Sequence, residues 1–495
     1  TVSIDPGRNL AADLVVELQA PAEQSLSSVL LTLNPGLRVD EVTTADGSAL
    51  AAEHADGLLE IALDRALAPG ERTSLRLRYG GRPNTGFGYL DSTLKLETLT
   101  TNEAQIGLLG YERGLFDRRY VALVPGIRWL PAAGVDVGRD GTRTRRTDYF
   151  RVALDVEVPS TWLVAGPGKR QTVGSSGDRT TFRFAPQPAV PEVALMAAEL
   201  KSFATEIDGI TFEVLVHPDH DRNFEVLADA RAEIEQWVAE RLELARDAGL
   251  AYPFDGFTAV EVPITLRSYK GGWRLDTALA PPAMMLLRET SFPTSRFDFD
   301  VIGVFVAGSR NYDQEGGKPR IDRDRLVNFF ANDLSGGNLL AGAARSFFMH
   351  RTSAAGPEGI ALDFVLEDLA TLLISGRRSY FSAHMFTNLN QAVTAVMNNL
   401  QGATAISDAV IRSQTLRNDV WDAALETPLS AIDPRDDPQR ALDTLALKGG
   451  KLAEVIRDRL GPDAIGRLLA RLVDDHAGGS FSLADFVAAS NSVSP

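Results

Sequence analysis

The hydrophobic period of this chain changes once, and the change divides the sequence into two kinds of structure. Up to about residue 205, apolar and polar residues alternate, as in "TSLRLRYGG" (73–81), "YFRVALDVEVP" (149–159) and "TTFRF" (180–184). A period of two is typical of strands with one buried face. Turn-forming clusters such as "NPG", "ADGS" and "SSGD" separate these runs, and no helical pattern comes between them. Residues 1–205 therefore predict an antiparallel, β-rich domain.

Helical spacing begins after this point. The spacing of the apolar residues after 223 predicts one face of a long helix that ends near Gly249. These residues are Phe224, Leu227, Ile234, Trp237, Val238 and Leu242. Two strand-like runs follow, at 257–266 and 300–308. Further helices are expected at 325–333, 338–350, 359–375, 384–400, 404–423, 441–460, 462–476 and 482–492. The last of these begins with "SLAD", which has the pattern of a capping box. The order is a sheet domain (1–205), a mixed α/β domain (206–440) and a helical tail (441–495).

Composition excludes several classes of function. The 495 residues carry a net charge of −16, which argues against a nucleic-acid-binding surface, because such a surface needs clustered Lys and Arg. The chain contains no cysteine, so disulfides, thiolate nucleophiles and Cys-ligated zinc are excluded.

Membrane insertion has no support within the chain itself. The longest clean apolar run, "VIGVFVAG" (301–308), is far shorter than the ~20 residues of a membrane helix. The first residues, "TVSIDPGRNL", have neither the charged start nor the apolar core of a signal peptide. Because the sequence also begins without Met, we expect a soluble piece whose membrane anchors lie outside it.

Several stretches, in this order, resemble the aminopeptidase N family of zinc peptidases. "LAYPFDGFTAVEVP" (250–263) resembles the Tyr-Pro-Phe stretch that leads into that family's catalytic domain, and "PPAMMLLRE" (281–289) resembles the strand after its exopeptidase motif. The closest match is residues 447–489, which resemble the family's Lys-Gly helix, its Leu-Gly turn and its Asp-Phe closing helix. The resemblance implies an α+β multidomain fold: an N-terminal β saddle or sandwich, a thermolysin-like α/β domain and a C-terminal helical tail.

One branch of this family is resembled more than the others. "RYVALVPGIRWLPAAG" (119–134) and "WLVAGPGKR" (162–170) are similar to the extracytoplasmic peptidase-like domain that is fused into certain bacterial ABC transporter permeases. The resemblance implies a domain on the periplasmic face of the bacterial inner membrane, tethered by segments outside this chain. Its partners would be the transmembrane segments and the ATPase subunit of the transporter, with a peptide or protein ligand as a further candidate and no nucleic acid.

The zinc-binding chemistry of that family is missing from the corresponding helix. The family holds zinc with the two His of H-E-x-x-H, and the Glu between them acts as general base. When "LLAGAARSFF" (339–348) is laid on this motif, Gly342 and Ser346 take the His positions and Ala343 takes the Glu position. Glycine has no side chain, alanine cannot accept a proton, and a single serine hydroxyl is a poor zinc ligand.

The third zinc ligand of the family is a Glu on the next helix. The family's spacing places it at Val365, and Glu367 fits if "SAAGPEG" (353–359) contains a two-residue insertion. The alternative interpretation is a glutamate on a half-buried helix that is paired with an arginine, since carboxylates are seldom buried alone.

Two further parts of the family's site are replaced as well. In "YKGGWRLD" (269–276), Arg274 lies near the position of the Glu that would hold the substrate's α-amine, and arginine repels an ammonium group. In "TLALKGG" (444–450), Ala446 takes the place of the tyrosine that stabilises the oxyanion. Tyr269, Trp273, Arg274 and Glu367 could still line a peptide-binding groove, or Trp273 could be part of a core that has closed the cleft.

A second candidate metal cluster lies elsewhere in the chain. "HPDHDR" (217–222) contains His217, Asp219, His220 and Asp221, which could bind a metal ion. The alternative is a loop that leads into a helix, with Asp219 or Asp221 as its N-cap.

From these observations we expect a catalytically inactive, aminopeptidase-N-like module of an ABC transporter permease, with no cofactor, acting in substrate or peptide binding, gating or partner docking. Two alternatives remain open at this point. The chain could be an active metallopeptidase whose metal site uses other residues, or a free-standing periplasmic scaffold protein.

Overall fold

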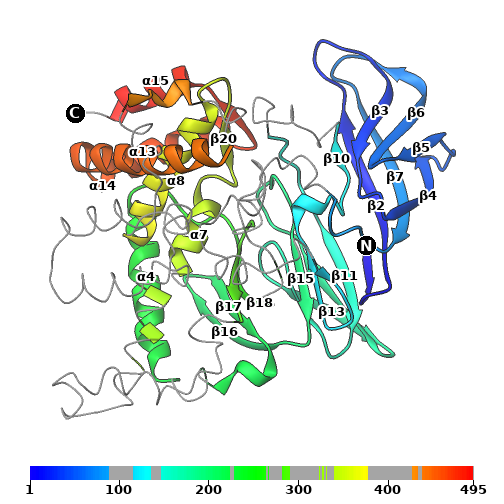
Figure 1. Ribbon diagram of the computed structural model, residues 1–495, viewed down its shortest axis with the longest axis horizontal. Helices are drawn as coiled ribbons and strands as arrows, with labels where there is room; N and C mark the ends of the chain where they lie inside the picture. Colours follow the sequence, from blue (N-terminus) through cyan, green and yellow to red (C-terminus); the bar gives the residue numbers. More distant parts are fainter. Residues whose placement is uncertain are drawn as a thin grey trace.

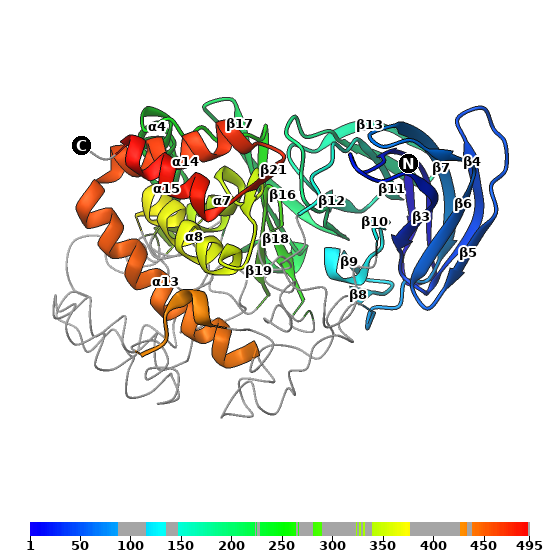
Figure 2. The same ribbon diagram turned by 90° about the horizontal axis from the view of Figure 1, so that it is seen from above.

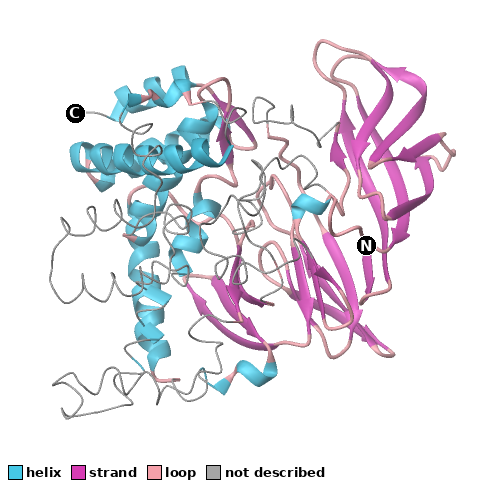
Figure 3. Ribbon diagram, in the orientation of Figure 1, coloured by secondary structure: helices cyan, strands magenta, loops and turns pink. Residues whose placement is uncertain are grey.

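The computed structural model separates strands from helices: the sheets lie on one side of the molecule and most of the helices on the other (Figures 1 and 3). The structure describes residues 1–87, 115–134, 147–222, 224, 228–263, 266, 281–289, 323, 326–327, 330–331, 339–376, 426–432 and 438–493.

Seven strands of the N-terminal half form the largest sheet. In spatial order they are β13 (Gln171–Ser176), β14 (Arg179–Phe184), β11 (Leu154–Pro159), β1 (Val2–Asp5), β2 (Asn9–Gln19), β7 (Arg72–Gly81) and β4 (Leu37–Thr44). Neighbouring strands are antiparallel except β1 and β11, which are parallel. In β7, Leu75, Leu77 and Tyr79 are buried while Arg76 and Arg78 are exposed, as the alternation predicted.

A four-stranded sheet faces this one and completes a sandwich. Its strands, in order, are β10 (Ala132–Ala133), β3 (Leu26–Thr32), β6 (Leu58–Leu67) and β5 (Ala52–Ala55). Leu59 and Ile61 of β6 belong to the same buried cluster as Leu75 and Leu77 of the larger sheet. The inner faces of the two sheets therefore share one hydrophobic core, as in other β-sandwiches.

A third sheet connects the sandwich to the rest of the chain. Its order is β12 (Leu163–Ala165), β15 (Leu195–Ala198), β9 (Tyr120–Leu123) and β8 (Leu115–Phe116). The chain after β9 makes a short 3-10 turn, η1 (Pro125–Ile127), and buries Trp129, whose indole N–H donates to the carbonyl oxygen of Val193 at 3.2 Å.

The central sheet consists of β16 (Lys201–Ile207), β17 (Ile210–Val216), β18 (Gly256–Val262) and β19 (Met284–Arg288). The first two strands form an antiparallel hairpin, and the last three run parallel. Helix α4 (Ala230–Asp247) lies between β17 and β18 in the chain. Every residue of β18 is buried, because the sheet is covered on both faces.

The two faces of the central sheet belong to different cores. Val260 and Val262 pack with the N-terminal sandwich, whereas Phe257 and Ala259, which alternate with them along β18, pack with the helices. Tyr120 of β9 also donates its hydroxyl to the carbonyl oxygen of Glu261 at 2.7 Å. Figure 2 shows the central sheet between the sandwich and the helical layer.

Helices α4 and α7 (Leu339–Phe347) contact the other face of the central sheet. The helical layer continues behind them with α8 (Gly359–Ser375), α13 (Pro438–Leu460), α14 (Pro462–His476) and α15 (Leu483–Val493). A short parallel pair, β20 (Thr352–Ala354) with β21 (Gly479–Phe481), ties the chain after α7 to the turn before α15, and a 3-10 turn, η4 (Leu429–Ala431), precedes α13. None of the helices in the described part of the chain combines the length and hydrophobicity of a membrane span.

Local sequence signals account for several helix ends. The backbone N–H of Ser482 donates to the Asp485 carboxylate at 2.7 Å, and the N–H of Asp485 donates to the Ser482 hydroxyl at 3.3 Å, so the predicted capping box is confirmed. Helix α8 ends at Gly376, whose φ of 69° is the left-handed conformation that favours glycine. Arg241 of α4 donates to the last carbonyls of α8, on Leu373 and Ile374.

The expected fold class, an α+β multidomain protein with a β-rich N-terminal domain and a short helical C-terminus, is confirmed. The expected boundaries at 205 and 440 fall inside β16 and α13. The long helix predicted from Phe224 is interrupted: Phe224 is helical, residues 225–227 lie outside the described residues, and a turn at 228–229 precedes α4. The strand expected at 300–308 and the helices expected at 384–400 and 404–423 lie outside the described residues.

Candidate functional site

Helix α7 carries the positions where the resemblance places a zinc motif. All nine of its residues are buried, because the helix lies between β19 and α8. Its centre, "AGAA" (341–344), consists of small residues that let the backbone come close to the sheet. At Gly342 the contact is so close that a Cβ atom would lie 2.5 Å from Sδ and 2.9 Å from Cγ of Met285. A histidine at this position would have to displace the fully buried Met285 side chain.

The other two motif positions have structural environments of their own. Ala343 is 1% exposed and packs in the core beneath the helix. Ser346 accepts a hydrogen bond from the backbone N–H of Ala283 at 3.0 Å, and its hydroxyl lies 3.1 Å from Nδ1 of His350. Ala283 has a φ of 57°, an unusual conformation for a residue with a side chain. Ser346 thus ties α7 to the start of β19.

Glu367 is paired with an arginine, as the alternative interpretation of the sequence predicted. Nη1 of Arg345 on α7 lies 2.9 Å from Oε2 of Glu367 on α8. The two side chains are 9% and 8% exposed, so this ion pair is buried. Sequence reasoning had expected an arginine partner without naming Arg345, and the signal was present: an arginine in an otherwise small and apolar helix.

Tyr252, in the "YPF" stretch, packs against the same helix. Its ring centroid lies 5.0 Å from that of Phe347, and its hydroxyl donates to the carbonyl oxygen of Gly256 at 3.2 Å. Burial raises the pKa of Tyr252 well above its ordinary value, although a hydrogen bond with Ser346 lowers it in part. The phenol therefore stays neutral and acts as a hydrogen-bonding group of the core.

The structure does not describe the side chains of the remaining candidate cleft residues. Tyr269, Trp273 and Arg274 are outside the described residues, so a groove lined by them stays a prediction. The backbone of Ala446 lies in α13, but its side chain is not among those described.

Glu261 holds the histidine cluster at 217–222. His220 contacts the carboxylate of Glu261 through Nδ1, and the backbone N–H of His217 donates to the same carboxylate at 2.7 Å. The His217 side chain caps the 3-10 turn η2 (Pro218–His220), because its Nδ1 accepts from the Asp219 N–H, so Asp219 lies inside a turn and does not cap it. Asp221 pairs with Lys201 at 2.6 Å and directly precedes a helical residue at 222. Because residues 223 and 225–227 lie outside the described part of the chain, an N-cap at Asp221 stays a prediction.

Glu261 was not anticipated as a member of this cluster. It is an acidic residue inside the buried strand β18, and burial raises the pKa of its carboxyl, while hydrogen bonds from His217 and His220 oppose that shift. The signal in the sequence was a lone acid within the apolar run "FTAVEVP". Among the described residues, no set of three His, Asp or Glu side chains has a metal-binding arrangement.

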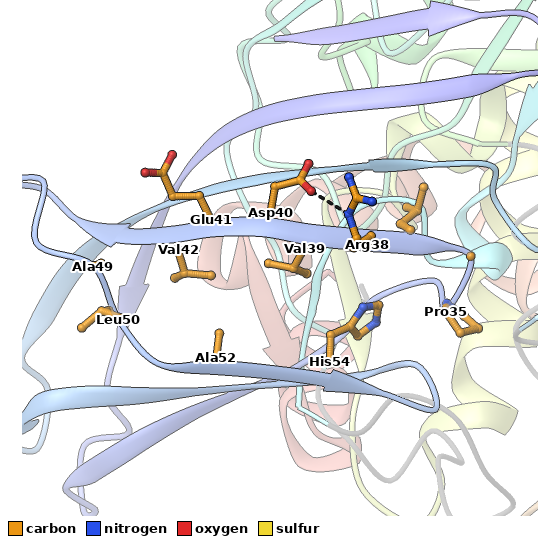
Figure 4. Close-up of a pocket in the computed structure, with 12 residues that line it drawn as sticks. Pro35, Arg38, Val39, Asp40, Glu41, Val42, Ala49, Leu50, Ala52 and His54 are labelled. Carbon is orange, nitrogen blue, oxygen red and sulfur yellow. Dashed lines mark hydrogen bonds and ion pairs between the residues drawn. The ribbon is translucent and has the colours of Figure 1, made fainter.

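A shallow groove lies at the other end of the molecule. It runs between β4 and β5, the last strands of the two sandwich sheets, and is lined by Val39, Val42, Leu50, Ala52 and His54 (Figure 4). Its charged rim is internally paired, since Arg38 bonds to Asp40 at 2.8 Å. A bulge in β4 and the charges beside it are features that keep an edge strand from pairing with other chains.

Comparisons with known proteins support the fold assignment. No protein-family model matches the sequence, and no curated protein matches it. Solved structures do match: this chain has the fold of M1 zinc metallopeptidases. The M1 zinc metallopeptidase from Deinococcus radiodurans is 14% identical, with a TM-score of 0.57 over 99% of this chain and 88% of that one. A two-domain M1 zinc metallopeptidase mutant bound to L-arginine is 15% identical, with a TM-score of 0.58 and the same coverage.

The residues at the motif positions do not fit a zinc ion. Position 342 has no side chain, and one placed there would have to displace Met285; Ala343 has no polar side-chain atom, and the Ser346 hydroxyl is engaged with the backbone of Ala283. Glu367 is the one carboxylate at these positions, and it is held by Arg345. A protein zinc site needs three or four converging ligands, which this set does not provide.

Proposed function

We propose that this chain is a peptidase-like domain without peptidase activity. It acts as an extracytoplasmic binding, gating or docking module of a bacterial ABC transporter permease. The observation that carries the first part is the packing of Met285 against Gly342, because a ligand side chain at that position would have to displace the Met285 side chain. The lack of activity thus has a basis in the core as well as in residue identity.

The loss of a general base supports the same proposal. In the resembled family the residue at position 343 would take a proton from the zinc-bound water, and Ala343 cannot do so. Removal of a general base typically lowers the rate by ~10²–10⁴. With the metal ligands also replaced, no measurable turnover is expected from this site.

The transporter context rests on the resemblance of residues 119–134 and 162–170. These two stretches supply β9 and β12, which are strands of the same buried sheet on either side of β15. They therefore belong to one structural unit at the junction between the sandwich and the central sheet, so both stretches of resemblance concern the same region of the fold.

Three observations test the proposal. Elemental analysis of the purified protein should find no stoichiometric zinc, and aminoacyl reporter substrates should release no amino acid. One zinc per chain together with chelator-sensitive aminopeptidase activity would overturn the inactive assignment. For the transporter context, the native open reading frame should encode hydrophobic membrane spans on both sides of this region, and a reading frame with no span on either side would contradict it.

A further inference from the structure

We infer that Arg345 replaces the metal ion of this fold as the cation between α7 and α8, so that the domain is held together without a divalent metal. This inference rests on the proposed function, since it assumes that no zinc occupies the cleft. Arg345 and Glu367 would together hold α7 and α8, a role that follows neither from the motif positions nor from the likeness in fold.

The Arg345–Glu367 pair lies where the resembled family holds its metal. Arg345 lies on α7 directly before Ser346, and Glu367 lies on α8 at the third-ligand position if residues 353–359 contain a two-residue insertion. A zinc ion with ligands from these two helices would join them at this level, and the Arg345–Glu367 bond of 2.9 Å joins the same two helices. One buried positive charge therefore faces the carboxylate, as a metal ion would.

Helix α8 buries several acidic residues. Asp363, Glu367 and Asp368 are all buried, so three acidic side chains lie within two turns of one helix. The carboxylate of Asp363 accepts the backbone N–H of Ala354 at 2.9 Å, which binds it to the loop at β20. Arg345 brings positive charge to this acidic helix from a neighbouring element, which reduces the repulsion among its carboxylates.

Buried ion pairs respond asymmetrically to the loss of one partner and of both. Removal of one partner leaves an uncompensated charge in the core and is strongly destabilising, whereas replacement of both partners by apolar residues of similar volume is often tolerated. If Arg345 is a built-in counter-ion, the two residues must show this coupling. If Arg345 merely fills space, an apolar side chain of similar length should serve nearly as well.

Thermal unfolding of the complete chain tests the inference. We compare the wild type with R345M, the double variant R345M/E367M and the charge-swapped variant R345E/E367R, each with EDTA and with added zinc chloride. R345M is expected to lower the midpoint by roughly 5–10 °C. The double variant should recover at least half of that loss, and the charge swap should recover part of it. As a matched control, R471M removes an exposed ion pair with Asp475 on α14 and should change the midpoint by about 1 °C or less.

The outcomes separate this inference from the proposed function. A wild-type midpoint that EDTA lowers, a harmless R345M, or a double variant no more stable than R345M overturns the counter-ion role. If R345M does not fold, a folded double variant supports the inference and an unfolded one refutes it. Zinc content and aminopeptidase activity are measured separately. Stoichiometric zinc with chelator-sensitive activity would refute the proposed function and this inference with it, whereas a zinc-free, inactive protein without coupling between Arg345 and Glu367 would refute the inference alone.

Discussion

The hydroxyl oxygen of Ser346 lies 3.0 Å from the backbone nitrogen of Ala283, so that the fourth residue after Gly342 anchors the start of strand β19. Both residues are buried, and Ala283 has a left-handed backbone that orients its N–H toward α7. The contact joins α7 to β19, the two elements whose close packing also occupies the side-chain space at Gly342. The two ligand positions are therefore parts of one helix–strand contact.

Replacement of Ser346 by alanine should destabilise the protein. The N–H of Ala283 would remain buried without its acceptor, and a buried unsatisfied donor costs ~1–3 kcal/mol. Chemical denaturation followed by circular dichroism measures the change. Ser490→Ala is the matched control, because among the described residues the partly buried Ser490 hydroxyl only donates, to the Phe486 carbonyl within α15 at 2.8 Å. Equal losses for the two variants would contradict the anchoring role of Ser346.

Gly342→Ala should also lower stability, by ~1–3 kcal/mol, because the added methyl group overlaps the Met285 side chain. Without that overlap, alanine would be favoured over glycine in a helix interior. The effect is therefore expected to shrink or change sign in a Met285→Ala background. A double-mutant cycle measured by denaturation checks this coupling. An equal cost in both backgrounds would show that Met285 is not the obstacle.

Restoration of the motif residues alone should not restore zinc binding. In the triple variant G342H/A343E/S346H, the new histidine at 342 meets Met285, and Arg345 still holds Glu367. We expect less than about one tenth of a zinc ion per chain after dialysis, because a site with too few free ligands does not retain zinc. Elemental analysis measures the metal, and circular dichroism verifies that the variant has folded. A folded triple variant with one zinc per chain would show that the core adjusts more easily than its packing suggests.

The N-terminal sandwich should show an acid-dependent loss of stability that depends on Glu71. A side-chain hydrogen bond from Arg65 and a backbone hydrogen bond from Ala68 lower the pKa of Glu71 to about 2. Because the folded pKa lies below the ordinary value of 4.5, the ionised form stabilises the folded state. That stabilisation is fully present above about pH 4.5 and is lost as the pH falls toward 2.

The difference in unfolding midpoint between the wild type and Glu71→Gln should therefore decrease as the pH is lowered from about 5 to about 3. In this range the unfolded chain binds roughly one proton at Glu71 that the folded chain does not bind. Arg65→Gln should remove most of this pH dependence, since Arg65 is the main cause of the shift. A difference between wild type and Glu71→Gln that stays constant across this range would contradict the assignment.

Local sequence patterns were sufficient for the elements of this fold. A period of two predicted β7 and β14, and "SLAD" predicted the start of α15, because these depend on neighbours in the chain. Residue identity alone also showed that the zinc motif is missing from residues 342–346. Glycine, alanine and serine cannot perform the chemistry of His, Glu and His in any fold. The arginine partner of Glu367 was predicted in kind, since a buried carboxylate requires a positive charge nearby.

Only the tertiary structure decided how those positions are used. That Met285 fills the space at Gly342, that Ala283 donates to Ser346, and that the partner of Glu367 is Arg345 are contacts between segments 22 to 63 residues apart. The same holds for Glu261, which meets His220 because β17 and β18 run parallel and bring their carboxyl ends together. Sequence determines which side chains can react or pair, but three-dimensional packing selects the partners, because many distant residues of suitable chemistry compete for each buried group.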